Sequence, residues 1–491
     1  MPRIAMRSIA AVSMLLVGAA CASVPSPSLP LESASPSSVP SAATPLLSLP
    51  SAAPPPGEFR LVGQEPLFGR GMNGALGLAG DHAYVGNRTD GSEGHLNPGI
   101  LVVDIGEPAA PTVIHEIGPP GAGNPGESTR ELRVWPGDDL LIVMSVACDP
   151  IAHLCGGGAR PSFRFFDIRA ELRAEPVLLA TYEPRQTPHE FFLWVDPEDA
   201  SRALLYVANT GSRVDLSVLD ISHARDGSVE EIATWSMDTR RQAAGLHSVS
   251  VSPDGRRAYM AFLTGGFFIL DTSALAEGAA AATIAPLGSL DDRLVWQGAG
   301  PHSAVPIPNR PLVLTTDEVY GGPGPLAGCP WGWVRLIDVA DATRPTVRSE
   351  YRVVPWNHEA NCAAVPDETD RNSTFSSHNP TVTEHLALVS WHAAGLQLID
   401  TSDAENPLQA AAFVSDPLAS VVTEDPVLSP GRDTAVMWSY PIVRDGLVYV
   451  VDVRNGLFVL SYDGPLADEL SGVAFLEGNS NIGPNVETPA G

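Results

Sequence analysis

The segment SHNPTVTEHLALVSWHAAGLQLIDTSDAENP, residues 377–407, decides the fold of this chain. It holds two apolar runs, LALVS and LQLID, and each run is followed by small or polar residues. Short runs rich in Val, Ile, Leu and aromatic residues, bounded by Gly, Pro and Asp, are typical of β-strands. The DTSDAENP stretch is rich in turn-forming residues and is expected to join one strand to the next. The segment therefore predicts strands connected by tight turns.

The same sequence pattern recurs along the chain. An apolar run, an Asp, a polar turn and a second apolar run begin near residues 100, 163, 216, 267, 334 and 396. A degenerate copy follows near residue 457, with Ser461 where the Asp belongs. About four strands per unit, repeated roughly every 58 residues, are the signature of propeller blades. We predict an all-β fold, a seven-bladed β-propeller over residues 58–465.

The N-terminus has the features of an export signal. Arg3 and Arg7 precede an apolar run, residues 9–20, that is too short to span a bilayer. The run ends in Gly18-Ala19-Ala20-Cys21, which is similar to a lipobox, although Gly18 replaces the usual Leu. We predict a lipoprotein signal peptide at residues 1–21 with Cys21 as the lipidation site; ordinary signal-peptide cleavage and secretion is the alternative.

Two further segments flank the predicted propeller. Residues 22–57 are rich in Ser, Pro and Ala, so they cannot build a core and are predicted to form a disordered tether. Residues 466–491 form a C-terminal tail that is rich in Gly, Asn and Pro, and we expect it to be loose. Together these features predict an exported protein, lipid-anchored in the cell envelope at the outer membrane, periplasm or cell surface.

The charge balance excludes several classes of partner. The chain has 29 basic and 57 acidic residues, a net charge of −28, and every basic residue is Arg. The absence of Lys excludes a Schiff-base lysine and a P-loop. Nucleic-acid binders need a basic footprint, and docking on anionic lipids needs basic residues as well. We therefore expect no nucleic-acid partner, and membrane contact only through the lipid anchor.

The cysteines agree with an oxidising compartment. Besides Cys21 the chain contains Cys148, Cys155, Cys329 and Cys362. An even number of cysteines in an exported protein predicts two disulfides. The connectivity stays open, although a local 148–155 bridge would leave 329–362. Metal binding by these cysteines is the alternative, but CxxC spacing is absent.

Histidines recur at the start of four successive blades. The openings TPHEFFLWV, GLHSVSVSP, GPHSAVPIP and SSHNPTV place one His each at the same point of the innermost strand. That strand lines the central channel of a propeller. The four residues are His189, His247, His302 and His378, and the equivalent positions of the other blades are Gly74, Arg130 and Ser439.

Four imidazoles at one level of a channel predict a metal site. Imidazole suits transition metals, and we consider Cu, Fe, Zn or Mn. Glu190, Arg130 and Glu318 are candidates for supporting the ligands. Because neighbouring residues on a regular strand point to opposite faces, His189 and Glu190 are not both expected to line the channel. The alternative is that each His only hydrogen-bonds to the next blade.

The remaining histidines receive structural interpretations. Trp391-His392 follows the LALVS strand near a loop on a face of the ring, and we favour aromatic packing between blades. The alternative is that this pair forms the wall of a ligand pocket. We expect the others to lie in turns or outer strands at the surface; they are His82, His95, His115, His153, His223, His358 and His385.

The repeat units resemble the LVIVD-repeat family of bacterial and archaeal surface β-propellers. The resemblance covers nearly all of residues 70–463 and is strongest in residues 377–407. It implies the propeller fold and a surface location, but the family has no single activity, and a fold does not supply one. The leading hypothesis is a cell-envelope-anchored propeller lipoprotein that binds a ligand or partner without catalysis and has a candidate axial metal site. The alternative is a metal-dependent, four-His oxidase or hydrolase that acts on a small molecule in the periplasm, with catalytic residues unassigned.

Overall fold

The computed structural model describes residues 55–118, 127–147, 160–211, 213–237, 245–279, 282–296, 298–319, 332–353, 375–428 and 435–483. The predicted signal peptide, Cys21, most of the tether and the four remaining cysteines lie outside these ranges. In the described part of the chain, no helix is both long and apolar enough to cross a membrane.

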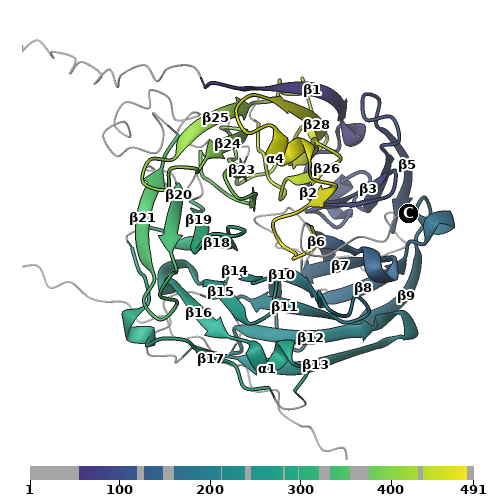
Figure 1. Cartoon of the computed structure of the whole chain (residues 1–491). Helices are drawn as coiled ribbons and strands as arrows, with labels where there is room; N and C mark the ends of the chain where they lie inside the picture. The colour runs from purple at the N-terminus through teal and green to yellow at the C-terminus, as the bar shows by residue number, and fades with distance from the viewer. Residues whose placement is uncertain are drawn as a thin grey trace, which may run out of the picture. The chain divides into compact units, whose positions relative to one another are not determined.

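The strands form seven antiparallel sheets arranged as the blades of a ring (Figure 1). Blade one contains β2 (Asn73–Ala79), β3 (His82–Asn87), β4 (Ile100–Asp104) and β5 (Thr112–Ile117). Blade two contains β6 (Glu127–Trp135), β7 (Leu140–Ala147), β8 (Ser162–Asp167) and β9 (Val177–Tyr182). Blade three contains β10 (Pro188–Val195), β11 (Ala203–Asn209), β12 (Leu216–His223) and β13 (Ser228–Trp235). Blade four contains β14 (Ser248–Val251), β15 (Arg257–Ala261), β16 (Phe267–Asp271) and β17 (Ala285–Pro286).

The last three blades follow the same plan. Blade five contains β18 (Pro301–Pro306), β19 (Leu312–Asp317), β20 (Val334–Asp338) and β21 (Thr346–Tyr351). Blade six contains β22 (Pro380–Val382), β23 (Leu386–Ser390), β24 (Leu396–Asp400) and β25 (Leu408–Phe413). Blade seven contains β26 (Ile442–Arg444), β27 (Leu447–Asp452), β28 (Gly456–Asp463), the N-terminal β1 (Glu58–Glu65) and β29 (Phe475–Leu476).

The helices are short and lie between strands. The α-helices of the described residues are α1 (Ser273–Ala276) and α4 (Asp468–Ser471). The 3₁₀ helices are η1 (Leu67–Gly69), η2 (Ser92–Gly94), η3 (Pro136–Asp138), η4 (Ala170–Leu172), η5 (Ala224–Asp226), η6 (Leu263–Gly265) and η7 (Leu290–Asp292). The predicted all-β, seven-bladed propeller is confirmed.

The N-terminal strand closes the ring. β1 pairs antiparallel with β28, from Glu58 opposite Asp463 to Glu65 opposite Leu457. The outermost strand of the last blade therefore comes from the start of the domain. Pairing the two ends of the ring in one sheet covers the edge of β28, and an uncovered edge would be open to pairing with another chain.

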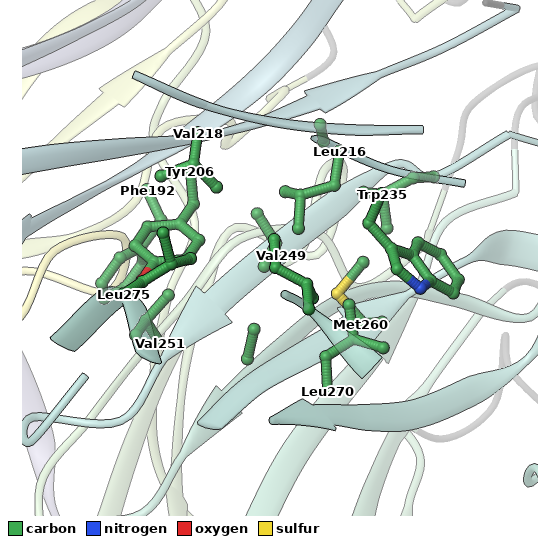
Figure 2. Packing of buried hydrophobic residues seen from close by; sticks show 14 of the residues in the cluster. Phe192, Tyr206, Leu216, Val218, Trp235, Val249, Val251, Met260, Leu270 and Leu275 are labelled. Atoms are coloured by element: carbon green, nitrogen blue, oxygen red, sulfur yellow. The ribbon is translucent and has the colours of Figure 1, made fainter. Parts of the chain in front are cut away.

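Apolar side chains fill the spaces between blades. Between blades three and four, Phe192 and Tyr206 of one sheet face Val249, Met260 and Leu270 of the next (Figure 2). All five are at most 4% exposed. Because burying one such side chain stabilises a fold by roughly 1.5–3 kcal/mol, contacts between blades hold the inner strands in place. These inner strands carry the candidate site.

The segment that follows the last blade is folded, contrary to our expectation of a loose tail, as far as the structure describes it. β29 pairs with β26 in blade seven, and the next residues reach blade three, where Ser480 lies opposite Leu193 of β10. The Asn481 side chain accepts a hydrogen bond from the Val195 N–H at 2.7 Å and donates one to the Val195 carbonyl at 2.7 Å. The segment crosses from blade seven to blade three near the axis of the ring (Figure 1), and it lies at the end of β10 that is remote from His189.

Candidate metal centre

An irregularity recurs at the start of the inner strands. In blades two, three and five the register shifts by one residue at Arg130, His189 and His302. In blade six the N–H of His378 and the carbonyl of the next residue, Asn379, both bond to Ser390. Two residues therefore oppose one, which defines a β-bulge. A bulge turns its side chain away from the regular pleat, and here it turns toward the channel.

The bulge overturns the expectation that His189 and Glu190 point to opposite faces. The alternation of a regular strand does not apply across an inserted residue. The candidate ligand atoms of His189, Glu190 and His247 lie within 4.8 Å of one another. Glu190 is therefore part of the cluster rather than a residue behind it. Its Oε1 atom lies 3.7 Å from His247 Nδ1 and 4.0 Å from His302 Nε2.

The four predicted histidines form one arc. The ring centroids of His189 and His247 are 4.2 Å apart, those of His247 and His302 are 3.9 Å apart, and those of His302 and His378 are 4.4 Å apart. Their ligand atoms do not converge on one point; within the described ranges they fall into three overlapping groups. These groups are His189–Glu190–His247, His247–His302–Glu318 and Glu318–His378–His392.

Glu318 is the centre of the buried end of the arc. Its carboxylate oxygens lie 3.3 Å from His302 Nε2, 3.5 Å from His378 Nε2 and 3.1 Å from His392 Nε2. We call these four residues the Glu318 cluster. The three imidazoles are 0–1% exposed and Glu318 is 4% exposed. Neither His302 Nε2 nor Glu318 Oε1 has a hydrogen-bond partner in the described structure.

His392 was missed as a site residue. Trp391 is buried and donates a hydrogen bond to the Phe375 carbonyl at 2.6 Å, as the packing interpretation suggested, but His392 turns into the channel. Its ring stacks on Trp438 with centroids 5.6 Å apart and an angle of 7° between the planes. Its backbone φ is 28°, in the left-handed region that costs a non-glycine residue about 1–3 kcal/mol.

The positions of Glu318 and His392 could have been found by comparing the second strands of blades five and six, β19 and β23. Thr316 lies opposite Ser303 in blade five, and Ser390 lies opposite Asn379 in blade six. Glu318 and His392 each follow those strand residues by two positions. They therefore occupy equivalent places on adjacent blades, and aligning LVLTTDE with LALVSWH would have paired them.

Hydrogen bonds orient the imidazoles of the cluster. His378 Nδ1 is 2.8 Å from the Trp438 carbonyl, which can only accept, so Nδ1 carries the proton. The Nε2 atom of neutral His378 then presents its lone pair to the Glu318 side. Metal-binding histidines are commonly fixed in this way by a backbone carbonyl on the second nitrogen. His302 Nδ1 contacts Ser303 Oγ at 2.8 Å.

Burial disfavours the charged form of three imidazoles of the arc. It lowers the pKa of His189, His247 and His378 well below the ordinary value, and Arg130 lowers the pKa of His189 further. Burial alone would raise the pKa of Glu318, but the facing His378 and His302 rings lower it well below its usual range. Neutral imidazoles beside a carboxylate are the protonation states that a transition metal requires of its ligands.

Glu190 and Arg130 lie at the other end of the arc. Burial, and next the charge of Glu131, raise the pKa of Glu190 to about 8. Arg130 Nη2 is 3.1 Å from His189 Nε2. Arg130 and His189 are only half-buried, so this end of the arc is the more accessible one.

The surface interpretation of the other histidines is wrong for one of them. His95 is 8% exposed, and its Nδ1 contacts Thr423 Oγ1 at 2.7 Å. His385 is half-buried and pairs with Glu469 at 2.6 Å. His153 and His358 lie outside the described residues.

No protein-family model and no curated protein matches this chain. Among solved structures, Sqt1 from Chaetomium thermophilum matches with 12% identity over 81% of this chain and 86% of that chain, at a TM-score of 0.45. The C-terminal WD40 domain of Sif2 matches with 8% identity over 82% of this chain and 98% of that chain, at a TM-score of 0.47. The assignment of a propeller rests on the seven sheets themselves.

Proposed function

We propose that this chain is a metal-dependent β-propeller protein. In this proposal the Glu318 cluster binds one divalent transition-metal ion, and the ion serves the oxidation or hydrolysis of a small molecule. One observation carries the proposal: the buried Glu318 carboxylate belongs to two groups of close ligand atoms, one with His378 and His392 and one with His302 and His247, and neither His302 Nε2 nor Glu318 Oε1 has a hydrogen-bond partner in the described structure.

The spacing of the cluster supports a metal ion. Ligands held at about 2.1 Å in a tetrahedral arrangement are about 3.4 Å from one another. The three contacts of Glu318 with the imidazoles are 3.1, 3.3 and 3.5 Å long. Glu318, His378 and His392 therefore have the spacing of ligands around a common ion, whereas His302 groups with His247 and Glu318.

The energetic cost of the arrangement also supports a ligand. A buried polar atom without a partner costs about 1–3 kcal/mol, and the positive φ of His392 adds a cost of similar size. A metal ion would offset these costs because it interacts with the lone pairs directly. Imidazole and carboxylate donors suit Zn, Fe, Cu and Mn. When bound, such an ion polarises a substrate oxygen or lowers the pKa of a coordinated water.

Access to the site is one-sided in this proposal. The C-terminal segment lies across the end of the channel that is remote from His189. The half-buried Arg130 and His189 mark the other end. A small molecule would reach the ion from the Arg130 side.

The proposed location rests on the sequence. We propose that the protein is exported, lipid-anchored through Cys21 and a member of the LVIVD-repeat family, with two disulfides among the remaining cysteines. The signal-like residues 1–21 and the resemblance of the repeats support this placement. Cys21→Ser should release the protein from the membrane fraction, and a variant that stays with the membranes would contradict lipid anchoring.

The test of the metal proposal is the metal content. The full chain is purified without a His tag and analysed by elemental mass spectrometry, beside Glu318→Gln and an exposed control, Glu171→Gln. We expect about one equivalent of ion in the parent and the control, and much less in Glu318→Gln. A parent that stays free of metal after reconstitution with Cu, Fe, Zn and Mn would contradict the proposal and favour a non-catalytic binding protein.

A further inference from the structure

Arg130 differs from the other arginines that are buried near the channel. Arg88 pairs with Asp425, Arg133 pairs with Glu131, and Arg335 pairs with Asp317. Arg130 has no carboxylate within salt-bridge distance among the described residues, and its hydrogen-bond contact there is with His189 Nε2 at 3.1 Å. A half-buried guanidinium thus faces the channel without a carboxylate at salt-bridge distance in the described part of the chain, although Glu190 is near enough for the charge of Arg130 to lower its pKa.

The position of Arg130 in the ring makes it a neighbour of the proposed ion site. It occupies the bulge of β6, the place that His189, His247, His302 and His378 occupy in the next four blades. On its other side, the equivalent residue of blade one is Gly74, which presents no side chain. Arg130 therefore lies between the histidine arc and a blade that presents no side chain at the equivalent position.

The nearby carboxylates do not account for this arginine. Glu131 is paired with Arg133 at 2.8 Å, and Glu190 lies nearer to His247 and His302. A guanidinium beside a site for a cation weakens cation binding through repulsion, unless an anion separates the two charges. Arginine also presents planar, paired N–H donors that fit a carboxylate or phosphate group with two parallel hydrogen bonds.

We propose that the small molecule on which the metal site acts is an anion, and that Arg130 binds its carboxylate or phosphate group. This inference rests on the proposed function. With the charged group on Arg130, the rest of the molecule extends along the histidine arc toward the Glu318 cluster. Three ring-to-ring steps of 4.2, 3.9 and 4.4 Å separate His189 from His378, so a molecule that follows the whole arc needs an extended chain of roughly ten bonds.

The test measures anion binding apart from metal binding. Zinc-loaded parent protein is titrated calorimetrically with benzoate, with inorganic phosphate and with benzamide, the neutral analogue of benzoate. We expect benzoate, phosphate or both to bind at least tenfold more tightly than benzamide. The comparison of benzoate with phosphate identifies which oxyanion the site takes.

Variants at position 130 locate the anion site. Arg130→Gln should weaken anion binding at least tenfold, and Arg130→Lys should fall between it and the parent because it keeps the charge but loses the paired donors. Arg213→Gln, at an exposed arginine, should bind as the parent does. Both Arg130 variants should keep the parent's zinc content and far-ultraviolet circular dichroism.

The outcomes separate this inference from the metal proposal. Equal affinity for benzoate, phosphate and benzamide, or unchanged anion affinity in Arg130→Gln, would overturn the role of Arg130 while the metal content still supports the proposed function. A parent that binds none of Cu, Fe, Zn and Mn would instead contradict the proposed function, and Arg130-dependent anion binding would then describe a metal-free site.

Discussion

Replacing Glu318 by Gln separates the metal-binding role of this carboxylate from its role in the fold. The two side chains have nearly the same shape, but Gln lacks the charge and places an N–H₂ group toward the imidazoles. One amide hydrogen could be donated to the lone pair of His302 Nε2, which has no partner in the described structure. Since the change also removes a buried charge, metal-free stability should change by no more than about 1 kcal/mol.

The metal-bound state should respond much more strongly. Glu318 contacts all three imidazoles of its cluster at 3.1–3.5 Å, so its carboxylate is the anionic ligand of the proposed ion. Residues that only support a ligand typically change metal affinity 10–100-fold, and loss of the ligand itself should cost at least about 100-fold. At an ion concentration of 100 times the parent Kd, binding stabilises the parent by about 2.7 kcal/mol. A variant with a 100-fold weaker Kd gains only about 0.4 kcal/mol.

The assay is urea denaturation of parent and variant, each with EDTA and with the ion identified by elemental analysis. The expected result is a metal-induced gain in the free energy of unfolding that is about 2 kcal/mol smaller in Glu318→Gln than in the parent. Glu171→Gln, an exposed control, should keep the full gain. If Glu318→Gln keeps the parent's gain, Glu318 is not a ligand and the argument from the unpaired atoms is wrong.

Three further predictions follow from the geometry. Burial raises the pKa of Glu190 to about 8, so between about pH 5 and pH 8 the metal-free folded chain holds a proton that the unfolded chain releases. The free energy of unfolding should therefore fall as pH rises through this range, by up to about 1.4 kcal/mol per pH unit. Glu190→Gln should flatten this slope in urea titrations with EDTA; an unchanged slope would contradict the assignment. Asn481→Ala removes two buried hydrogen bonds to Val195 and should cost about 2–4 kcal/mol in urea denaturation, and a loss below about 0.5 kcal/mol would show that the C-terminal segment is not fixed there. His392→Asn should keep the fold, because Asn tolerates positive φ, yet lose the metal in elemental analysis; full occupancy would exclude His392 as a ligand.

The fold was predictable because each repeat contains the same residue types at its strands and turns. In copies of the pattern that contain the Asp, a turn joins two apolar runs. In the structure these Asp carboxylates accept hydrogen bonds from the backbone N–H group two residues later. Asp400 accepts a hydrogen bond from the Ser402 N–H at 2.8 Å, and Asp338 accepts one from the Ala340 N–H at 2.9 Å. A local interaction that repeats in blades one to six leaves a pattern that one sequence suffices to reveal.

The site was predictable only in part, because its geometry depends on backbone features that have no residue signature. The equivalent position is His in blades three to six but Arg130 in blade two, Gly74 in blade one and Ser439 in blade seven, so no single residue type marks the bulge that brings Glu190 beside His189. Likewise, the Gly- and Asn-rich C-terminal residues are typical of a loop. Asn481 instead uses its amide group as a substitute for backbone pairing with Val195.

The asymmetry of the ring argues for a site rather than for a repeated structural contact. A histidine needed for contact with the next blade would be needed in all seven blades, yet blades one and two form four-stranded sheets, and blade seven a five-stranded sheet, without it. The histidines occupy four consecutive blades, and the acidic and histidine residues added at Glu318 and His392 fall on two of the same blades. The opposite side carries Gly74 and Arg130 at the bulge. A metal ion that acts on a substrate needs ligands on one side and an open approach on the other. In this ring the histidine arc and Glu318 lie on one side. On the other side Arg130 and Gly74 occupy the equivalent positions, and we expect the substrate to approach from there.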